Sequence, residues 1–303
     1  MIPILDCYSG RLHYIFGVME QKALQALVGQ AVKKTFAEFA GQKLETDQLA
    51  VTLMDLCEAE NPASAGYRGD TPIYPASVVK LFYLAAAHRQ MEDSKLRDTN
   101  ALRDALRDMI VDSGNEATSY VLDLLTDTTS GPELPPAELE QWSHKRDTVN
   151  RYFASLGYTG VNANKKTWHD RPYGRDRQII AEFKSERNFL TTNATARLLI
   201  EIVARKIISP IRCEQMKELL KRDFARADNA DNQAREYTGR ALPPDAKLWS
   251  KAGYMSQVRH DAAHVELPSG ARFVLVIFTA GHSDEKEIIP FLARQIVEDY
   301  EAA

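Results

Sequence analysis

Hydrophobic residues recur at helical spacing near both ends of the chain. Between Glu20 and Phe39 they return every three or four positions, and Gly41 follows as a residue that commonly ends helices. A second segment with the same period, DEKEIIPFLARQIVEDY, follows Ser283. Each pattern predicts an amphipathic helix whose apolar face packs against a core.

Strand-like runs lie just inside these two predicted helices. LAVTLMDL begins at Leu49 and is rich in β-forming residues, and SAGYRGDT is its predicted hairpin return. Toward the other end, KLWSKAGYM and RFVLVIFTA flank VRHDAAHVEL. The simplest closure pairs the early strands with the late ones in one sheet. The predicted fold class is therefore mixed α/β, or α+β, with a five-stranded antiparallel sheet flanked by helices.

The middle of the chain is predicted to be helical. Helical periodicity covers residues 77–89, 100–110, 116–125, 147–156 and 192–204. The polar loops TDTTSGPELPP and NANKKTWHDRPYGRDRQ lie between these segments. The layout predicts a discontinuous α/β subdomain, an inserted helical subdomain and a cleft between them. The predicted boundaries are 20–75 with 206–303 for the first subdomain, 76–205 for the insertion and 1–19 for an N-terminal extension.

Composition and charge narrow the class of protein. The 303 residues are 44% hydrophobic and 26% charged, with a net charge of −4, as in ordinary globular proteins. The chain has no block of Lys and Arg and no acidic tail, so nucleic acid is not an expected partner. No apolar run approaches the ~18 residues of a membrane span. We expect a monomer that acts on a small-molecule substrate.

Cysteine and histidine give no sign of a metal site or a disulfide framework. The three cysteines form no C-x-x-C pair, and His169, His260 and His264 lack the spacing of metal ligands. No metal or cofactor is therefore expected. The segment before Met19 lacks the basic and long apolar regions of a signal peptide. The sequence as it stands predicts a cytoplasmic protein, and a different N-terminus would leave a periplasmic or secreted location open.

The segment YPASVVKLFYLAAAHR, residues 74–89, places a hydroxyl and an ammonium in an apolar helix. Ser77 and Lys80 are one turn apart and share a helix face. A buried ammonium is costly unless it is paired or used, and desolvation lowers the pKa of a lysine until it can act as a base. The pattern points to an activated serine nucleophile. The alternative is an exposed lysine at the edge of a core helix.

Two further segments join this pattern in chain order. DMIVDSGNEATSYVLDLL contains Ser113 and Asn115 on either side of a glycine, and LWSKAGYMSQVRHDA contains Lys251 and Gly253 on either side of an alanine. Each pattern is weak by itself. Together they resemble the S-x-x-K, S-D-N and K-T-G elements of the penicillin-recognising serine hydrolases, most closely the class A β-lactamases. The resemblance extends over residues 20 to 300 and includes the order of helices and strands.

The resemblance implies a role for each matching residue. Ser77 is the expected acylated nucleophile, and Lys80 is the base or proton relay that activates it. Ser113 is expected to pass a proton to the leaving nitrogen, and Asn115 to hold the acylamino carbonyl of the substrate. Lys251 is the expected cation beside the substrate carboxylate and the Ser113 hydroxyl. These residues should converge in one cleft, with the Ser77 hydroxyl within about 3.5 Å of the Lys80 amine.

The same resemblance implies further substrate-binding positions. The oxyanion hole is expected at the backbone N–H groups of Ser77 and Tyr254, and one such donor typically contributes ~3 kcal/mol to lowering the barrier. Gly253 is expected to let its strand approach the substrate closely. Arg259 is a candidate second cation for the substrate carboxylate. Its alternative is a surface arginine at a strand end.

The sequence also departs from the family pattern. Gly114 stands in place of the aspartate, and Ala252 in place of the threonine, whose hydroxyl would supply a hydrogen bond of about 1–3 kcal/mol. The loop before TTNATARLL lacks the glutamate that positions the hydrolytic water in class A enzymes. Asp176 is the only carboxylate in the expected window, and an aspartate in a surface ion pair is the alternative for it. Glu182 and Glu186 are further candidates.

Three functional hypotheses result. The leading one is a serine hydrolase that opens β-lactam amides through a Ser77 acyl-enzyme and releases the product slowly. A peptide or ester hydrolase of the same superfamily is the first alternative. The second is a non-catalytic ligand-binding protein that kept the fold. The missing glutamate favours this last hypothesis, whereas the retained Ser77 and Lys80 oppose it because binding alone needs no activated nucleophile.

Overall fold

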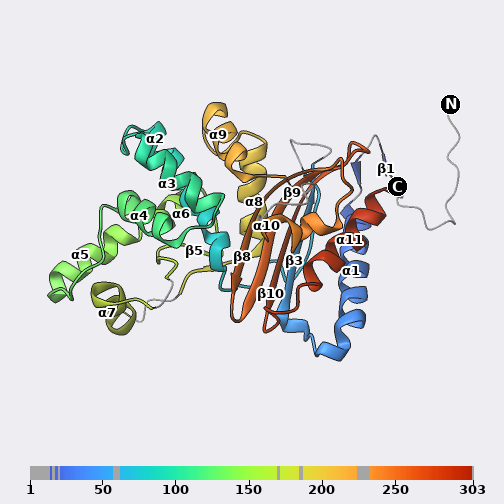
Figure 1. The fold of residues 1–303 in the computed structure, drawn as a ribbon, viewed down its shortest axis with the longest axis horizontal. Coiled ribbons are helices and arrows are strands. Elements are labelled where there is room, and N and C mark those ends of the chain that lie inside the picture. Colours follow the sequence, from blue (N-terminus) through green and yellow to red (C-terminus); the bar gives the residue numbers. More distant parts are fainter. Residues whose placement is uncertain are drawn as a thin grey trace, which may run out of the picture.

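One antiparallel sheet of six strands runs through the computed structural model, which describes residues 14–15, 18–19, 21–56, 62–168, 171–183, 187–223 and 232–301 (Figure 1). Across the sheet the strands are β4 (Ser64–Tyr67), β3 (Leu49–Asp55), β10 (Arg272–Ala280), β9 (Val258–Glu266), β8 (Lys247–Met255) and β7 (Lys221–Arg222). The predicted pairing of early and late strands is confirmed, because β3 and β10 pair from Leu49 with Thr279 to Asp55 with Phe273.

The predicted number of five strands is wrong by one. The sixth strand, β7, has two residues and extends the sheet beyond β8, where Lys221 pairs with Trp249. Two residues are too few to show the alternation of a strand in sequence. Two smaller sheets lie elsewhere, β1 (Tyr14–Ile15) with β2 (Val18–Met19) and β5 (Val161–Asn162) with β6 (Phe189–Leu190).

The apolar run of β10 explains how the two sides of the sheet are filled. Successive strand residues point to opposite faces. Val274, Val276 and Phe278 join the core on the side of the inserted helices. Phe273, Leu275 and Ile277 join the core on the other side. A strand buried on both faces carries no polar alternation, so RFVLVIFTA is apolar almost throughout.

The two terminal helices cover one face of the sheet, as predicted. Figure 1 shows α1 (Gln21–Glu38) and α11 (Ile288–Glu301) side by side against it. Leu24 and Val28 of α1 are fully buried in the same core as Leu292 and Ile296 of α11. The four-residue spacing within each pair places both side chains on one helix face.

The other face of the sheet is covered by α8 (Thr192–Val203), which packs against β3, β9 and β10.

The central helix of the inserted region is α2 (Lys80–Glu92), whose residues from Lys80 to His88 are all buried. The helices around α2 are α3 (Asn100–Ile110), α4 (Asn115–Thr126), α6 (Thr148–Ser155) and α9 (Pro210–Leu220). Those in the ranges 100–110, 116–125, 147–156 and 192–204 match the predicted segments closely. The subdomain boundaries stay a prediction.

Four helices were not predicted, namely α5 (Pro136–Arg146), α7 (Gly174–Glu182), α9 and the short α10 (Asn232–Arg235). α7 lies within and just beyond one of the segments expected to be a loop. Ile179 is the one apolar side chain of α7 that is buried, and it packs against Leu139 and Trp142 of α5. With so few apolar positions, neither α5 nor α7 carries a period that can be recognised, and the packing between them stabilises both.

The remaining short elements are α10 (Asn232–Arg235) and four 3₁₀ segments, Phe39–Gln42, Thr46–Gln48, Ala76–Val79 and Thr238–Ala241. Among the described helices, none is both long enough and apolar enough to cross a membrane. The segment before Met19 lies mostly outside the described residues, as do His169 and Glu186.

Candidate active site

Ser77 lies on a short 3₁₀ turn, Ala76–Val79, rather than within the α-helix expected there, and α2 begins at Lys80. The turn is closed by a hydrogen bond from the Val78 N–H to the Pro75 carbonyl, 3.0 Å. Ala76 has a φ of +45°, a left-handed conformation that costs an ordinary residue about 1–3 kcal/mol. Such strain persists only where the surroundings impose it.

His260 anchors the segment just before this turn. Thr279 N–H donates to His260 Nδ1 at 3.2 Å, so the ring proton resides on Nε2, which donates to the Tyr74 carbonyl at 2.8 Å. Burial lowers the pKa of His260 to about 4, which keeps the ring neutral. His260 was considered in the sequence only as a metal ligand. Its positioning role has no sequence signature, because it depends on which carbonyl the sheet brings to it.

Lys80 is fully buried, which excludes the alternative of an exposed lysine. Its Nζ donates to the Ser113 carbonyl at 2.6 Å, to Ser113 Oγ at 3.2 Å and to Asn115 Oδ1 at 2.9 Å. Burial lowers the pKa of Lys80 to about 7, and the charge of Glu116 opposes this shift. The free amine and the ammonium are therefore both populated near neutral pH.

The expected hydrogen bond between Ser77 and Lys80 is not among those that the described residues form. Three acceptors already occupy the three N–H groups of the Lys80 ammonium. An ammonium has no lone pair, so only the neutral amine can accept the Ser77 hydroxyl proton. Lys80 can therefore act as a base toward Ser77 only when Lys80 is deprotonated.

Lys251 approaches the same serine from the sheet. Its Nζ is fully buried on β8 and donates to Ser113 Oγ at 3.0 Å, to Gln233 Oε1 at 2.5 Å and to the Ala252 carbonyl at 2.8 Å. Ser113 itself has a φ of +56°. Two lysines from different elements therefore converge on one hydroxyl held in a strained turn. Gln233 is a site residue that the sequence did not reveal, since a single glutamine carries no pattern.

Gly253 brings β8 against the Ser77 turn. A Cβ at this position would lie 2.7 Å from the Pro75 carbonyl oxygen and 3.1 Å from the Ser77 nitrogen. Gly253 was predicted to let its strand approach the substrate closely, and in the structure its nearest neighbour is the backbone of the segment that leads into the Ser77 turn. The close approach requires glycine, because a backbone atom cannot move aside as a flexible side chain can.

Gly253→Ala is therefore expected to lower the free energy of unfolding by about 1–3 kcal/mol through overpacking and to displace the Ser77 turn. The measurement is thermal unfolding. Gly29→Ala is the matched control, because a Cβ at Gly29, inside α1, meets nothing within 4 Å. That change should stabilise the helix by about 0.5–1 kcal/mol. Equal unfolding temperatures for the two variants would contradict this account.

Arg259 and Tyr254 lie on the β8–β9 hairpin. Arg259 is 3% exposed, so it is not a surface arginine. Its Nη2 donates to Glu236 Oε2 at 2.9 Å, and its guanidinium lies 4.4 Å from the ring centre of Tyr237 and 5.6 Å from that of Tyr254. A substrate carboxylate at Arg259 would have to compete with Glu236. The substrate-binding roles of Arg259 and Tyr254 stay predictions.

Asp176 is buried in α7, with 4% of its surface exposed. Its Oδ1 lies 3.7 Å from Arg146 Nη2, and its Oδ2 has no hydrogen-bond partner among the residues that the structure describes. The alternative of a surface ion pair is wrong, because both partners are buried. The arginines next to Asp176 in sequence bind elsewhere, Arg175 to the Pro132 carbonyl and Arg177 to Glu133. Glu182 is exposed.

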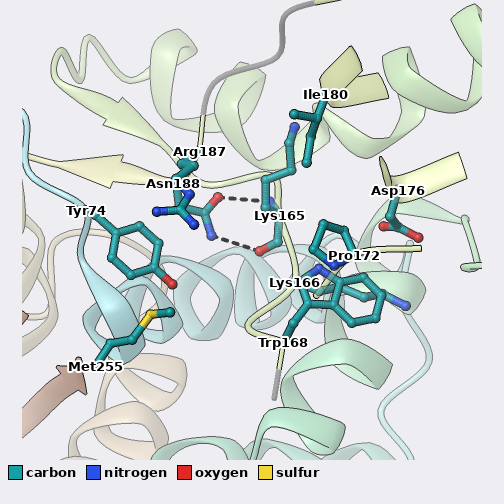
Figure 2. A pocket seen from close by; sticks show the side chains of 10 residues that line it. All are labelled: Tyr74, Lys165, Lys166, Trp168, Pro172, Asp176, Ile180, Arg187, Asn188 and Met255. Atoms are coloured by element: carbon teal, nitrogen blue, oxygen red, sulfur yellow. Dashed lines mark hydrogen bonds between the residues drawn. The ribbon is translucent and has the colours of Figure 1, made fainter. Parts of the chain in front are cut away.

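A pocket of about 270 Å³ is lined by Asp176 of α7 and by Tyr74, three residues before Ser77. Figure 2 shows Tyr74 and Asp176 at opposite sides of it, with the ring of Trp168 between them. Its lining residues are Tyr74, Lys165, Lys166, Trp168, Pro172, Asp176, Ile180, Arg187, Asn188 and Met255. Three of these residues are cationic and one is a carboxylate, so the pocket carries a net positive charge. Within the described ranges no group of three or more His, Cys, Asp or Glu side chains is arranged to hold a metal ion.

Comparison with known proteins gives a family and a set of related folds. The model of a family described as the β-lactamase enzyme family matches residues 95–300, or 206 of the 303 residues. The match includes Ser113 and Lys251 and begins after Ser77 and Lys80. No curated protein matches the sequence.

Solved structures show the same fold at low identity. A β-lactamase from Sphaerobacter thermophilus is 19% identical, with 90% of this chain and 96% of that chain covered and a TM-score of 0.65. A β-lactamase from Chitinophaga pinensis is 17% identical, with coverages of 89% and 98% and a TM-score of 0.65. A mutant of PBP-A, described as an acyl-enzyme complex with penicillin-G, is 17% identical, with coverages of 92% and 98% and a TM-score of 0.66.

Proposed function

This chain belongs to the β-lactamase enzyme family, and on that premise we propose that it is a serine hydrolase that forms an acyl-enzyme on Ser77 with a β-lactam amide. The observation that carries the proposal is the convergence of two buried lysines on the Ser113 hydroxyl, at 3.2 Å for Lys80 and 3.0 Å for Lys251. Removing an ammonium group from water carries a desolvation penalty of several kcal/mol. Buried lysines with a perturbed pKa are therefore concentrated at functional sites.

Acylation begins with the neutral form of Lys80. Its amine accepts the proton of the Ser77 hydroxyl while Ser77 Oγ forms a bond to the lactam carbonyl carbon. The electron pair of the C=O bond moves to the oxygen, and backbone N–H groups of Ser77 and Tyr254 are the proposed donors to that oxyanion. When the carbonyl re-forms, the C–N bond breaks and the nitrogen takes a proton from Ser113 Oγ. Lys80 returns a proton to Ser113 across the 3.2 Å contact.

The remaining site residues orient the substrate in this proposal. Asn115 accepts from Lys80 through Oδ1, which leaves its Nδ2 to donate to the acylamino carbonyl of the substrate. Lys251 holds the lactam carboxylate by charge and keeps Ser113 in position. Ala252 provides no hydroxyl for that carboxylate, so substrate binding is weaker than threonine would allow by about 1–3 kcal/mol.

Deacylation is proposed to be the slow step. The family glutamate is absent, and the candidate base, Asp176, is held by Arg146 at 3.7 Å. Its unpartnered Oδ2 is the atom that would accept a proton from water. Loss of an effective general base costs about 10²–10⁴ in rate, so an acyl-enzyme should accumulate.

The test is intact mass measurement over time after mixing with penicillin-G. The expected result is a rise in mass by one whole penicillin, located by peptide mapping to the fragment that contains Ser77 and absent in Ser77→Ala. Asp176→Asn should lengthen the life of the adduct if Asp176 is the base, and rapid turnover unchanged in that variant would exclude it. Neither adduct nor turnover in the wild type would overturn the proposal and favour a non-catalytic binding protein.

A further inference from the structure

The pocket described above includes residues from two segments that also form the Ser77 site. Tyr74 precedes Ser77 by three residues and lines one side of the pocket (Figure 2). Met255 lines it two residues after Gly253, the position whose Cβ would lie 3.1 Å from the Ser77 nitrogen. A substituent close to the carbonyl that Ser77 attacks can therefore reach into this pocket.

The pocket is separate from the end of the site assigned to the lactam carboxylate. Its lining includes none of Ser113, Lys251 and Arg259. With the carboxylate held at Lys251, the opposite end of the substrate is its acylamino side chain. That side chain is the part that would enter the pocket.

The positive charges of the pocket differ in how far they are neutralised. Lys166 Nζ lies 2.6 Å from Asp123 Oδ2, and Asp176 faces Arg146 at 3.7 Å, so these groups are matched in charge. Arg187 is exposed and forms no ion pair with any residue that the structure describes, and its guanidinium lies 5.5 Å from the ring centre of Tyr74. Figure 2 shows Arg187 at the Tyr74 side of the pocket.

Lys165 is a further lysine of the pocket wall, and its Nζ donates to the Asn164 side chain at 3.0 Å. Burial lowers the pKa of Lys165 to about 8, so it remains mostly protonated at neutral pH. The other walls are Trp168, Pro172 and Ile180, which offer apolar surface for a ring. A volume of about 270 Å³ is below the ~300–1,000 Å³ of a site for a whole ligand and suits a single substituent.

We propose that this pocket selects substrates whose acylamino side chain carries an anionic group next to an aromatic ring, and that Arg187 is the residue that binds this group. The inference rests on the proposed acylation of Ser77, because it names the class of substrate that the same site prefers. The ring would lie against Trp168 and Pro172, and the anion would face Arg187.

The test uses two penicillins that differ by one carboxylate, penicillin-G and its α-carboxybenzyl analogue. The wild type should be acylated faster by the carboxylated compound, and Arg187→Gln should lower the ratio of the two rates about tenfold. Arg177→Gln is the matched control, because Arg177 is an exposed arginine paired with Glu133 that does not line the pocket. That control should keep the wild-type ratio. An unchanged ratio in Arg187→Gln, with both compounds still acylating Ser77, would overturn the inference and leave the proposed function intact.

A second measurement decides the inference even if neither penicillin acylates the protein. Phenylmalonate and phenylacetate are the free side chains of the two compounds, and their binding to Ser77→Ala can be followed by the fluorescence of Trp168. Phenylmalonate should bind more tightly, and the additional substitution Arg187→Gln should remove its advantage. Trp168→Phe identifies the part of the signal that comes from the pocket. Equal binding of both compounds would refute the anion site, whatever the fate of Ser77.

Discussion

Lys80→Met is expected to slow the acylation of Ser77 by penicillin-G by about 10²–10⁴-fold, the usual contribution of a positioned general base. This corresponds to about 3–5 kcal/mol of barrier at 1.36 kcal/mol per decade. The reason is the burial of Lys80, which lowers its pKa to about 7 and so supplies a neutral amine at physiological pH. Methionine fills a similar volume without an amine.

The pH dependence of the acylation rate tests the same role of Lys80. A lysine with a lowered pKa is protonated below about pH 7 and free above it, so the wild-type acylation rate should rise as the pH increases through about 7. Lys80→Met should lack this rising limb. Lys145→Met is the control, because Lys145 pairs with Asp127 at the surface. A variant that keeps the wild-type rate and the limb would show that another group removes the Ser77 proton.

The sequence indicated those candidate site residues that belong to a recognisable motif. It did not indicate those that are defined only by their hydrogen bonds in the folded chain. Ser77 and Lys80 stand out because a hydroxyl and an ammonium interrupt an apolar helix. Lys251 stands out only together with the Ser77 and Ser113 segments, as the third element of the family pattern. His260 and Gln233 act through one carbonyl and one amine, and only the folded chain brings these groups together.

The fold follows the same division. Most helices were predictable because burial on one face imposes a period, as in α1 and α8. The sheet was predictable because its longer strands are runs rich in β-forming residues. β7 and α7 were not, since β7 has two residues and α7 is fixed by packing against α5. The ion pair of Asp176 shows the limit most directly. The local sequence offered two neighbouring arginines, yet the partner is Arg146, which α5 supplies from 30 residues earlier in the chain.

A largely buried cluster of charged side chains at the pocket wall links α4, α5 and the segment that carries Lys166. Asp123 of α4 lies 2.9 Å from Arg146 of α5 and 2.6 Å from Lys166, which lines the pocket. The side chains of Arg146 and Lys166 are only 2% and 5% exposed. Asp123 is thus the carboxylate shared by two buried cations, and Asp176 is a more distant neighbour of one of them.

Asp123→Ala is therefore expected to lower the free energy of unfolding by about 3–5 kcal/mol, the cost of leaving buried charge without its partner. Asp127→Ala is the matched control. Asp127 is also an aspartate at the end of α4 with a lysine 2.6 Å away, but both partners of that pair are exposed. Surface pairs contribute little, and alanine at the left-handed φ of +48° of Asp127 adds only a small strain, so this variant should unfold within about 1 kcal/mol of the wild type. Denaturant unfolding of both variants measures the difference. Similar midpoints would mean that water hydrates Arg146 and Lys166 once the carboxylate is removed. A large gap would instead show that the buried charges of Arg146 and Lys166 depend on the Asp123 carboxylate for their stability.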